Sequence, residues 1–130
     1  METRTTFTLT RIIVFGHRLD LLKSFYVNDF NFTVVEEIEN QWLVLNAGHT
    51  ELAFHKVGPG YEPPAGEKFV AESNTKLVFG ISGDIYHFRE KLAREGVDIG
   101  DVKKFDGINS LFCDGHDPEG NVFQLEQKLA

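Results

Sequence analysis

The order of the predicted elements repeats along the chain, and this repeat constrains the fold more than any other feature. In the first half, apolar and β-branched runs predict strands at residues 9–15, 32–38, 42–46 and 51–56. In the second half, weaker and stronger runs predict strands at residues 76–82, 97–103, 109–114 and 122–126. One amphipathic helix follows the first strand of each half. The shared order, strand–helix–strand–strand–strand (βαβββ), favours a duplicated unit.

The apolar faces of the two predicted helices also correspond. With one constant offset of 66 positions, the matched pairs are Leu19 and Ile85, Leu22 and Phe88, and Tyr26 and Leu92. Chance agreement between two amphipathic helices is the alternative. For the second helix, Asp84 is a good N-cap and Gly96 a good C′ residue.

A tight turn precedes the last predicted strand. Pro118 has the φ of a turn position, and Gly120 and Asn121 tolerate positive φ. Beyond the turn, residues 122–126 alternate between apolar and polar, which is typical of a half-buried strand.

Composition bounds the class of protein. The chain has 130 residues, 42% of them hydrophobic and 12 of them Phe, which is enough for one domain with a real core. We therefore expect a single domain over residues 1–130, with module one at 7–57, a Pro- and Gly-rich linker or mobile flap at 58–75, and module two at 76–128.

Several function classes are disfavoured. No run approaches the roughly 18 apolar residues of a membrane span, and the first residues lack the apolar region of a signal peptide. The single cysteine, Cys113, fits a reducing compartment. The net charge of −7 without a basic cluster disfavours nucleic acid. We expect a cytoplasmic protein with no membrane or nucleic-acid partner.

The Asp-Pro-x-Gly-Asn turn before a strand that carries Gln124 resembles the closing strand of the vicinal oxygen chelate (VOC) family. This family includes glyoxalases, bleomycin- and fosfomycin-resistance proteins and extradiol dioxygenases. Residues 11–26, 50–54 and 84–97 also look like its first strand and helix, its fourth strand, and its second helix with the following exit. The resemblance implies an α+β fold: two βαβββ modules forming a curved mixed sheet with a concave cavity.

The resemblance also implies where a metal would bind. Metal-dependent members place ligands on the first and fourth strands of each module, and these positions match Arg11, Glu51, Leu77 and Gln124. Only Glu51 is a strong ligand, because arginine stays protonated and leucine has no lone pair. We therefore expect no metal and no other cofactor at this site. A relocated metal site with Glu51, His55 and His116 is the alternative.

Two arrangements of Arg11 are open. Matched to the family, Arg11 faces Glu51 and neutralises it as a metal would. Alternatively, Arg11 lies at the start of a strand and points to water.

The hairpin register extends the candidate site. A two-residue loop at Gly48-His49 pairs Asn46 with Glu51 and Trp42 with His55 on one face. The predicted ligand-binding residues are Arg11, Phe15, Trp42, Asn46, Phe79 and Gln124. An apolar cavity with a few polar groups suits a small organic ligand, and a closed core is the alternative. Glu51 and His55 are the candidate catalytic residues, since the pKa of histidine is near neutral, although His55 can equally be an inert edge residue.

Three hypotheses of function follow from the resemblance. The first is a bleomycin-resistance-like protein that binds a small apolar or aromatic molecule without metal. The alternative is a metal-dependent lyase, isomerase or dioxygenase of the glyoxalase type with a non-standard ligand set. The third is an accessory module without a ligand. Whether the protein is an enzyme stays open, and the resemblance implies a homodimer.

Overall fold

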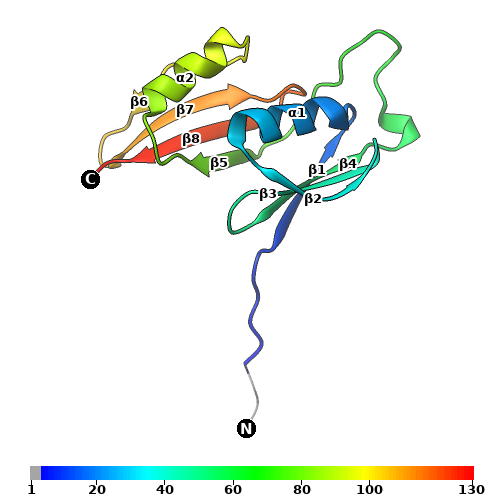
Figure 1. The fold of residues 1–130 in the computed structure, drawn as a ribbon, viewed down its shortest axis with the longest axis horizontal. Helices are drawn as coiled ribbons and strands as arrows, with labels where there is room; N and C mark the ends of the chain where they lie inside the picture. Colours follow the sequence, from blue (N-terminus) through cyan, green and yellow to red (C-terminus); the bar gives the residue numbers. More distant parts are fainter. Residues whose placement is uncertain (1–3) are drawn as a thin grey trace. The chain divides into compact units, whose positions relative to one another are not determined.

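The computed structural model describes residues 4–130. These form two compact units, one up to Ala65 and one from Gly66 to Ala130. Each unit has its own four-stranded sheet and one longer helix (Figure 1). The predicted α+β class and the paired βαβββ modules are confirmed.

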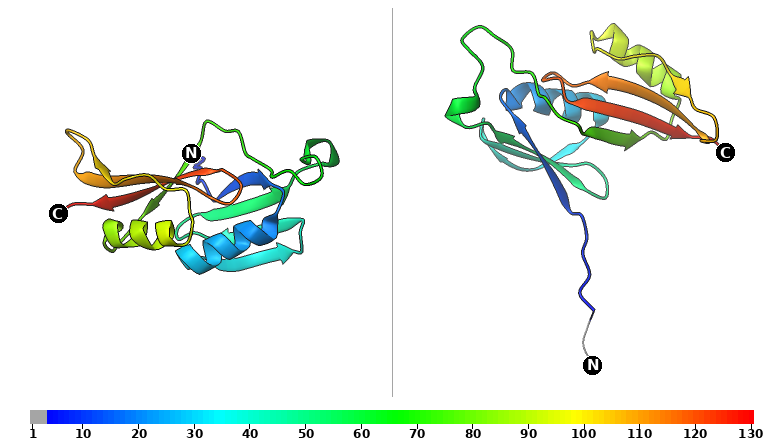
Figure 2. Two further views of the ribbon diagram at one scale, coloured as in Figure 1. Left: turned by 90° about the horizontal axis from the view of Figure 1, so that it is seen from above. Right: turned by 180° about the vertical axis from the view of Figure 1, so that it is seen from behind.

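The first unit has all five predicted elements. They are β1 (Arg11–Gly16), α1 (Leu19–Phe30), β2 (Thr33–Ile38), β3 (Trp42–Asn46) and β4 (Glu51–Lys56). The segment that follows carries one short 3-10 helix, η1 (Pro59–Tyr61), and is otherwise a loop without regular secondary structure (Figure 2).

The second unit repeats this order. Its elements are β5 (Lys76–Gly80), α2 (Ile85–Arg94), β6 (Lys103–Lys104), β7 (Ser110–His116) and β8 (Val122–Lys128). The strand orders are β1-β4-β3-β2 and β5-β8-β7-β6, so in each unit the first strand pairs with the fourth. That pairing is parallel in both units, whereas the other pairings are antiparallel. The same topology in both halves is what a duplicated unit predicts.

Helix α1 covers one face of the first sheet through an aromatic cluster. Tyr26 is fully buried and stacks on Phe54 of β4, with ring centroids 5.5 Å apart. Phe25 meets the Tyr26 ring edge-on at 5.0 Å. Such pairs contribute about 0.5–1.5 kcal/mol each beyond the burial of their area. The apolar spacing of α1 therefore decides which face of the sheet is covered.

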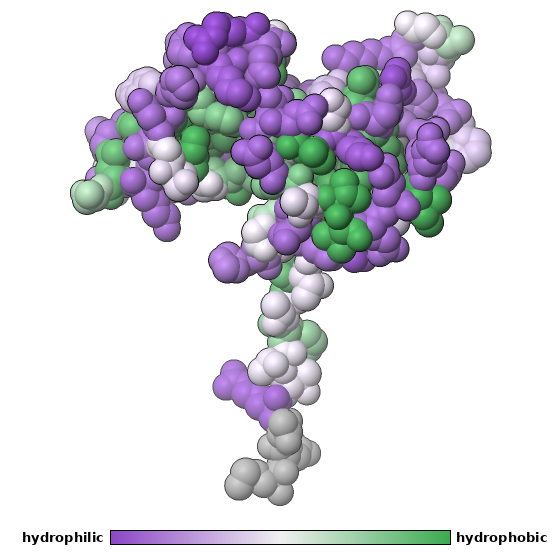
Figure 3. Space-filling model, in the orientation of Figure 1, coloured by the Kyte–Doolittle hydropathy of each residue, from purple (hydrophilic) through white to green (hydrophobic). Residues whose placement is uncertain are grey.

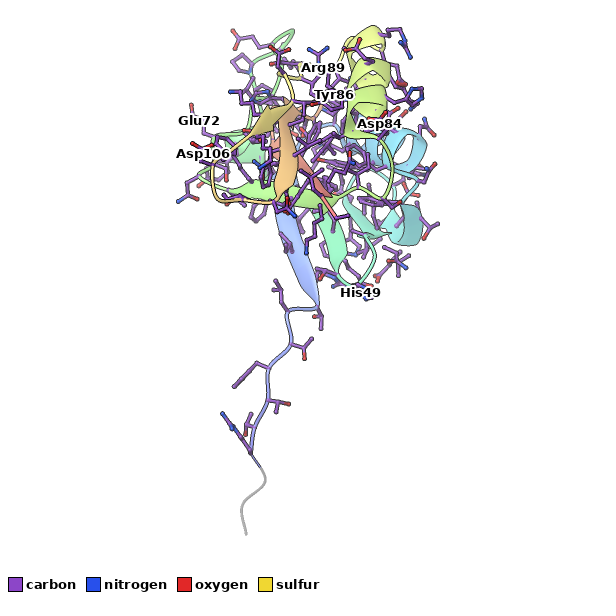
Figure 4. The ribbon with its side chains drawn as sticks, turned by 90° about the vertical axis from the view of Figure 1, so that its left-hand side faces the viewer. His49, Glu72, Asp84, Tyr86, Arg89 and Asp106 are labelled. Carbon is purple, nitrogen blue, oxygen red and sulfur yellow. The ribbon has the colours of Figure 1, made fainter. Side chains whose placement is uncertain are left out.

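Helix α2 begins and ends as its sequence predicts. The Asp84 side chain accepts a hydrogen bond from the backbone N–H of Tyr86 at 2.9 Å, at the start of the helix (Figure 4). Gly96 follows the C-cap with φ +86°, a conformation that costs glycine little. Ile85 and Leu92 are fully buried, and the outer surface of α2 is hydrophilic (Figure 3).

The predicted strand at 97–103 is only partly present. Ile99 forms a single bridge to Gly115, and the regular pairing is limited to the two residues of β6. Asp98, Gly100 and Asp101 interrupt the apolar alternation that a continuous edge strand needs, and residues of this kind are depleted in strands.

The turn before β8 is held by one buried carboxylate. Asp117 is 4% exposed, and its Oδ1 accepts hydrogen bonds from the backbone N–H groups of Glu119 and Asn121 at 2.9 and 3.0 Å. Its Oδ2 accepts from Nδ2 of Asn121 at 2.8 Å. Gly120 has φ +84°, as predicted, and an added Cβ there would lie 3.2 Å from a methyl group of Val70. The turn that marks the family resemblance is thus a buried polar anchor for β8.

No helix in the described range 4–130 is long and apolar enough to cross a bilayer.

We predict that Asp117→Asn lowers the free energy of unfolding by about 1–3 kcal/mol, because an amide in place of Oδ2 meets the Asn121 amide donor to donor. Urea unfolding measures the change. The matched control is Asp106→Asn, on an exposed loop (Figure 4), which should stay within about 0.5 kcal/mol of the parent. Equal losses in the two variants would contradict this role for Asp117.

Candidate functional site

The strand register of the first unit brings the predicted site residues onto one face of its sheet. Arg11 lies beside Glu51 in the parallel β1–β4 pair, and Phe15 lies beside His55. In the β3–β4 hairpin Trp42 lies beside His55 and Asn46 beside Glu51, as the loop length predicted. Gly48 has φ +100°, which the first position of the predicted turn requires.

This face is the one that α1 does not cover. Side chains alternate along a strand, and Phe54 points to Tyr26 of α1, so its neighbours Ala53 and His55 point the other way. We call this surface the Trp42 face and define it by Arg11, Phe15, Trp42, Glu51 and His55. Phe15 is 60% exposed, so the face has a large apolar side chain open to solvent.

Arg11 and Glu51 form an ion pair. Glu51 Oε1 accepts a hydrogen bond from Arg11 Nε at 3.0 Å and lies 2.8 Å from Nη2. The two side chains are 35% and 33% exposed. Of the two arrangements that the sequence left open, the structure has the pair. Arg11 is therefore neutralised across the strand pair and does not point to water.

The same guanidinium also lies over the ring of Trp42. Its Cζ is 5.4 Å from the ring centroid, within the range of a cation–π interaction. Val44 and Ala53, the small residues between these side chains on the face, are fully buried. Arg11 therefore links the one strong carboxylate of the face to its largest aromatic ring.

His55 lies between two other rings. Its ring is 5.6 Å from that of Phe15 and 6.0 Å from that of Trp42, both edge-on. Its Nδ1 is 2.8 Å from the carbonyl oxygen of Lys56. A carbonyl can only accept, so Nδ1 carries the hydrogen and Nε2 is the acceptor of the neutral ring. The ring is exposed, and its accepting nitrogen is the only basic atom of the aromatic group.

Asn46 has a structural task. Its Oδ1 accepts a hydrogen bond from the backbone N–H of Gly48 at 2.9 Å, which holds the β3–β4 turn whose tip is His49 (Figure 4). Asn46 lies on the expected face, and its amide nitrogen and the second lone pair of Oδ1 are left for a ligand.

The second unit has a polar cluster on the sheet face opposite α2. Lys76 Nζ lies 2.7 Å from Oδ2 of Asp114, and Gln124 Nε2 donates to Oδ1 of Asp114 at 3.0 Å. Burial raises the pKa of Asp114, but the hydrogen bonds from Lys76 and Gln124 and the charges of Lys76 and Lys103 outweigh it and lower the pKa below its usual value. Gln124, a predicted ligand-binding residue, is thus occupied by Asp114.

Leu77 and Phe79 lie on the other face of the sheet from the one predicted. Both pair with buried residues of β8, Leu77 with Phe123 and Phe79 with Leu125, so they lie on the opposite face from Gln124. The offset of 66 that relates the helices does not carry over to the strands, since β1 begins at Arg11 and β5 at Lys76, an offset of 65. A shift of one residue moves a side chain to the other face of a strand. The first residue of β5 on the Gln124 side is Lys76.

A cavity of about 860 Å³ opens within the first unit, where the β1–α1 connection approaches the β2–β3 turn. Its lining is mostly charged, and the charges pair among themselves: Arg18 with Asp20 at 2.8 Å, and Lys23 with Glu37 at 2.8 Å. Trp42 lines this cavity as well as belonging to the Trp42 face. No sequence motif marks this cavity, and none marks Lys76 or Asp114, so none of the three was predicted.

Several solved structures are similar to this fold. A lactoylglutathione lyase from Agrobacterium tumefaciens aligns over 95% of this chain and 96% of its own, with 13% identity and a TM-score of 0.73. An integron cassette protein from V. cholerae aligns over 97% and 98%, with 17% identity and a TM-score of 0.70. The fosfomycin resistance protein FosX from Listeria monocytogenes aligns over 98% and 96%, with 12% identity and a TM-score of 0.67.

The chain has the vicinal oxygen chelate fold. Its neighbours in structure belong to the VOC superfamily. By contrast, no protein-family model and no curated protein matches the sequence. The fold predicted from the resemblance is therefore confirmed by structure at low sequence identity.

The residues present do not fit the metal that the VOC fold implies. Arg11 and Lys76 stand on the first strand of each unit, and both are protonated cations without a lone pair to donate. Within residues 4–130, no group of three or more His, Cys, Asp or Glu side chains could hold a metal ion. Glu51, the one matched carboxylate, is already paired with Arg11.

We predict a pH-dependent contribution from the pair of Lys76 and Asp114. The pKa of Asp114 is lower in the folded than in the unfolded chain. The stabilisation is therefore complete above the usual aspartate pKa of about 4 and is lost as the pH falls through the folded-state pKa. Lys76→Gln should lower the free energy of unfolding by at most about 1 kcal/mol at pH 7, because the pair is half exposed.

The deficit of Lys76→Gln should shrink as the solution is acidified below about pH 4. Chemical denaturation at a series of pH values measures it. Lys128→Gln, which changes an exposed lysine at the end of β8, is the control and should show no such trend. A deficit that stays constant down to the acid limit would contradict the assignment to Asp114.

Proposed function

We propose that the Trp42 face binds a small, planar, apolar or aromatic molecule without a metal, as a bleomycin-resistance-like binding protein does. The observation that carries the proposal is that Arg11 contacts both Glu51 and Trp42. It fills the family's metal position with a cation of the protein and leaves an aromatic surface beside it.

The chemistry of the face supports a ligand of this kind. Phe15, Trp42 and His55 supply ring surfaces in edge-to-face contact, against which a further ring can pack. The few polar groups, Arg11, Glu51 and the Asn46 amide, can orient a substituent. The exposed ring of Phe15 lies against His55, which in turn lies against Trp42, and contiguous exposed apolar surface of this kind marks binding sites. A bound ligand is the partner we infer.

The alternative is a glyoxalase-type lyase, isomerase or dioxygenase with a non-standard ligand set, in which Glu51 and His55 act as acid and base. One structural neighbour is a lactoylglutathione lyase, but at 13% identity it speaks for the fold alone. Metal content separates the two candidates. The homodimer implied by the resemblance stays a prediction.

We predict that the protein takes up no stoichiometric divalent metal at Glu51. The reason is that Arg11 occupies the carboxylate and offers only donors. Elemental analysis after incubation with nickel, zinc and manganese, followed by desalting, measures the content. About one equivalent per chain that disappears in Glu51→Ala would contradict the proposal and favour the enzyme.

We predict that small aromatic molecules change the fluorescence of Trp42, the only tryptophan, in a saturable way. Trp42→Ala should weaken their binding about tenfold, which corresponds to about 1.4 kcal/mol of lost contact. Calorimetry measures binding in the variant, since its fluorescence reporter is absent.

The matched control is Tyr86→Ala, which removes an exposed ring from α2 in the other unit (Figure 4). It should leave the affinity unchanged. A broad screen of aromatic molecules that gives no saturable change, with the protein folded, would rule out the proposed function.

A further inference from the structure

The ion pair on the Trp42 face uses only one of the two carboxylate oxygens of Glu51. Both guanidinium contacts, from Nε at 3.0 Å and from Nη2 at 2.8 Å, go to the same carboxylate oxygen, Oε1 of Glu51. Within the part of the chain that the structure describes, residues 4–130, Oε2 of Glu51 and Nη1 of Arg11 have no hydrogen-bond partner. Since about a third of each side chain is exposed, these atoms are accessible to a ligand.

The pair has no net charge and leaves one donor nitrogen, Nη1, and one acceptor oxygen, Oε2, without a contact, and Nη2 keeps one of its two N–H groups. Nη1 can donate to a ligand oxygen, and Oε2 can accept from a ligand N–H. A carboxylate supplies acceptors only and meets the charge of Glu51. An ammonium supplies donors only and meets the charge of Arg11. A neutral carboxamide or lactam supplies both an acceptor and a donor, so it can bond to a free guanidinium N–H or to Oε2 without meeting a like charge and without opening the pair.

The aromatic surroundings set the rest of the ligand. The guanidinium lies over the Trp42 ring at 5.4 Å, so a group that bonds to the pair is held next to that ring. Phe15 and His55 continue the apolar surface. A planar ring attached directly to the amide can pack there while the amide contacts the pair.

We infer that the ligand class of the Trp42 face is planar aromatic molecules that carry a neutral carboxamide or lactam, selected against carboxylates and amines by the Arg11–Glu51 pair. This rests on the proposed function, because it names the ligand of the same face. The selection is a matter of charge, so it must reverse when either partner of the pair is neutralised.

The experiment uses three probes with the same ring: 2-naphthamide, 2-naphthoate and 2-naphthylmethylammonium. Their affinities for the whole chain are measured by calorimetry at neutral pH and low salt, where charge effects are least screened. The expected result is that 2-naphthamide binds at least tenfold more tightly than either charged probe. Tighter binding of a charged probe, or equal binding of all three, would overturn the inference and leave the proposed function intact.

Two variants then test the cause. Arg11→Gln leaves Glu51 unpaired, and the ammonium probe should become the tightest binder. Glu51→Gln leaves Arg11 unpaired, and the naphthoate should become the tightest. Because each variant is expected to gain affinity for one probe, a general loss through misfolding is distinguishable. If neither variant folds, the order of the three probes on the parent chain decides alone.

The control is Arg18→Gln, which breaks an exposed ion pair with Asp20 elsewhere in the same unit. It should keep the parent's order of probes, and a reversal there would refute the role of the Arg11–Glu51 pair. If none of the three probes binds the parent chain at millimolar concentration, the inference fails, whereas the proposed function is decided separately by the broad screen of aromatic molecules.

Discussion

The parallel pairing of the first strand with the fourth is the constraint on which each unit depends. It joins residues that are 40 positions apart, such as Arg11 and Glu51, and the helix and the strands between them form the crossover connection that parallel strands need. The strand register then decides everything on the two faces of the sheet. On one face Phe54 packs against helix α1, and on the other face Arg11, Trp42 and His55 form the candidate site.

Both units use the first strand in the same electrostatic way. Arg11 of β1 is neutralised by Glu51, and Lys76 of β5 is neutralised by Asp114. A cation at this place cannot ligate a metal, but it can hold a carboxylate in position and keep the sheet face neutral. The desolvation of these charges costs little free energy, because both ion pairs are partly exposed to solvent and none of the four charges is buried without its partner.

Much of the fold could be predicted because its signals are local. The bounds of β3 and β4 follow from alternation and from a turn with glycine at its positive-φ position. The Asp84 cap and the Gly96 end of α2 follow from residues within one helical turn. Where a local signal is weak, the prediction is confirmed only in part. Residues 97–103 give one bridge and a two-residue strand, since neighbours along the sheet, more than the segment itself, decide whether an edge strand forms.

The sequence by itself determined the order of elements, the hairpin register and hence the shared face of Trp42, Asn46, Glu51 and His55, because these depend on alternation and on loop length. Only the tertiary structure decided three other matters. It paired Arg11 with Glu51 and set it over Trp42. It placed Leu77 and Phe79 on the face away from Gln124, and it placed Lys76 on the Gln124 face instead. It joined Lys76 to Asp114 across β8. These three arrangements depend on the register between strands that are distant in sequence. A shift of one residue in that register moves every side chain of the strand to the other face, and no local sequence pattern determines it.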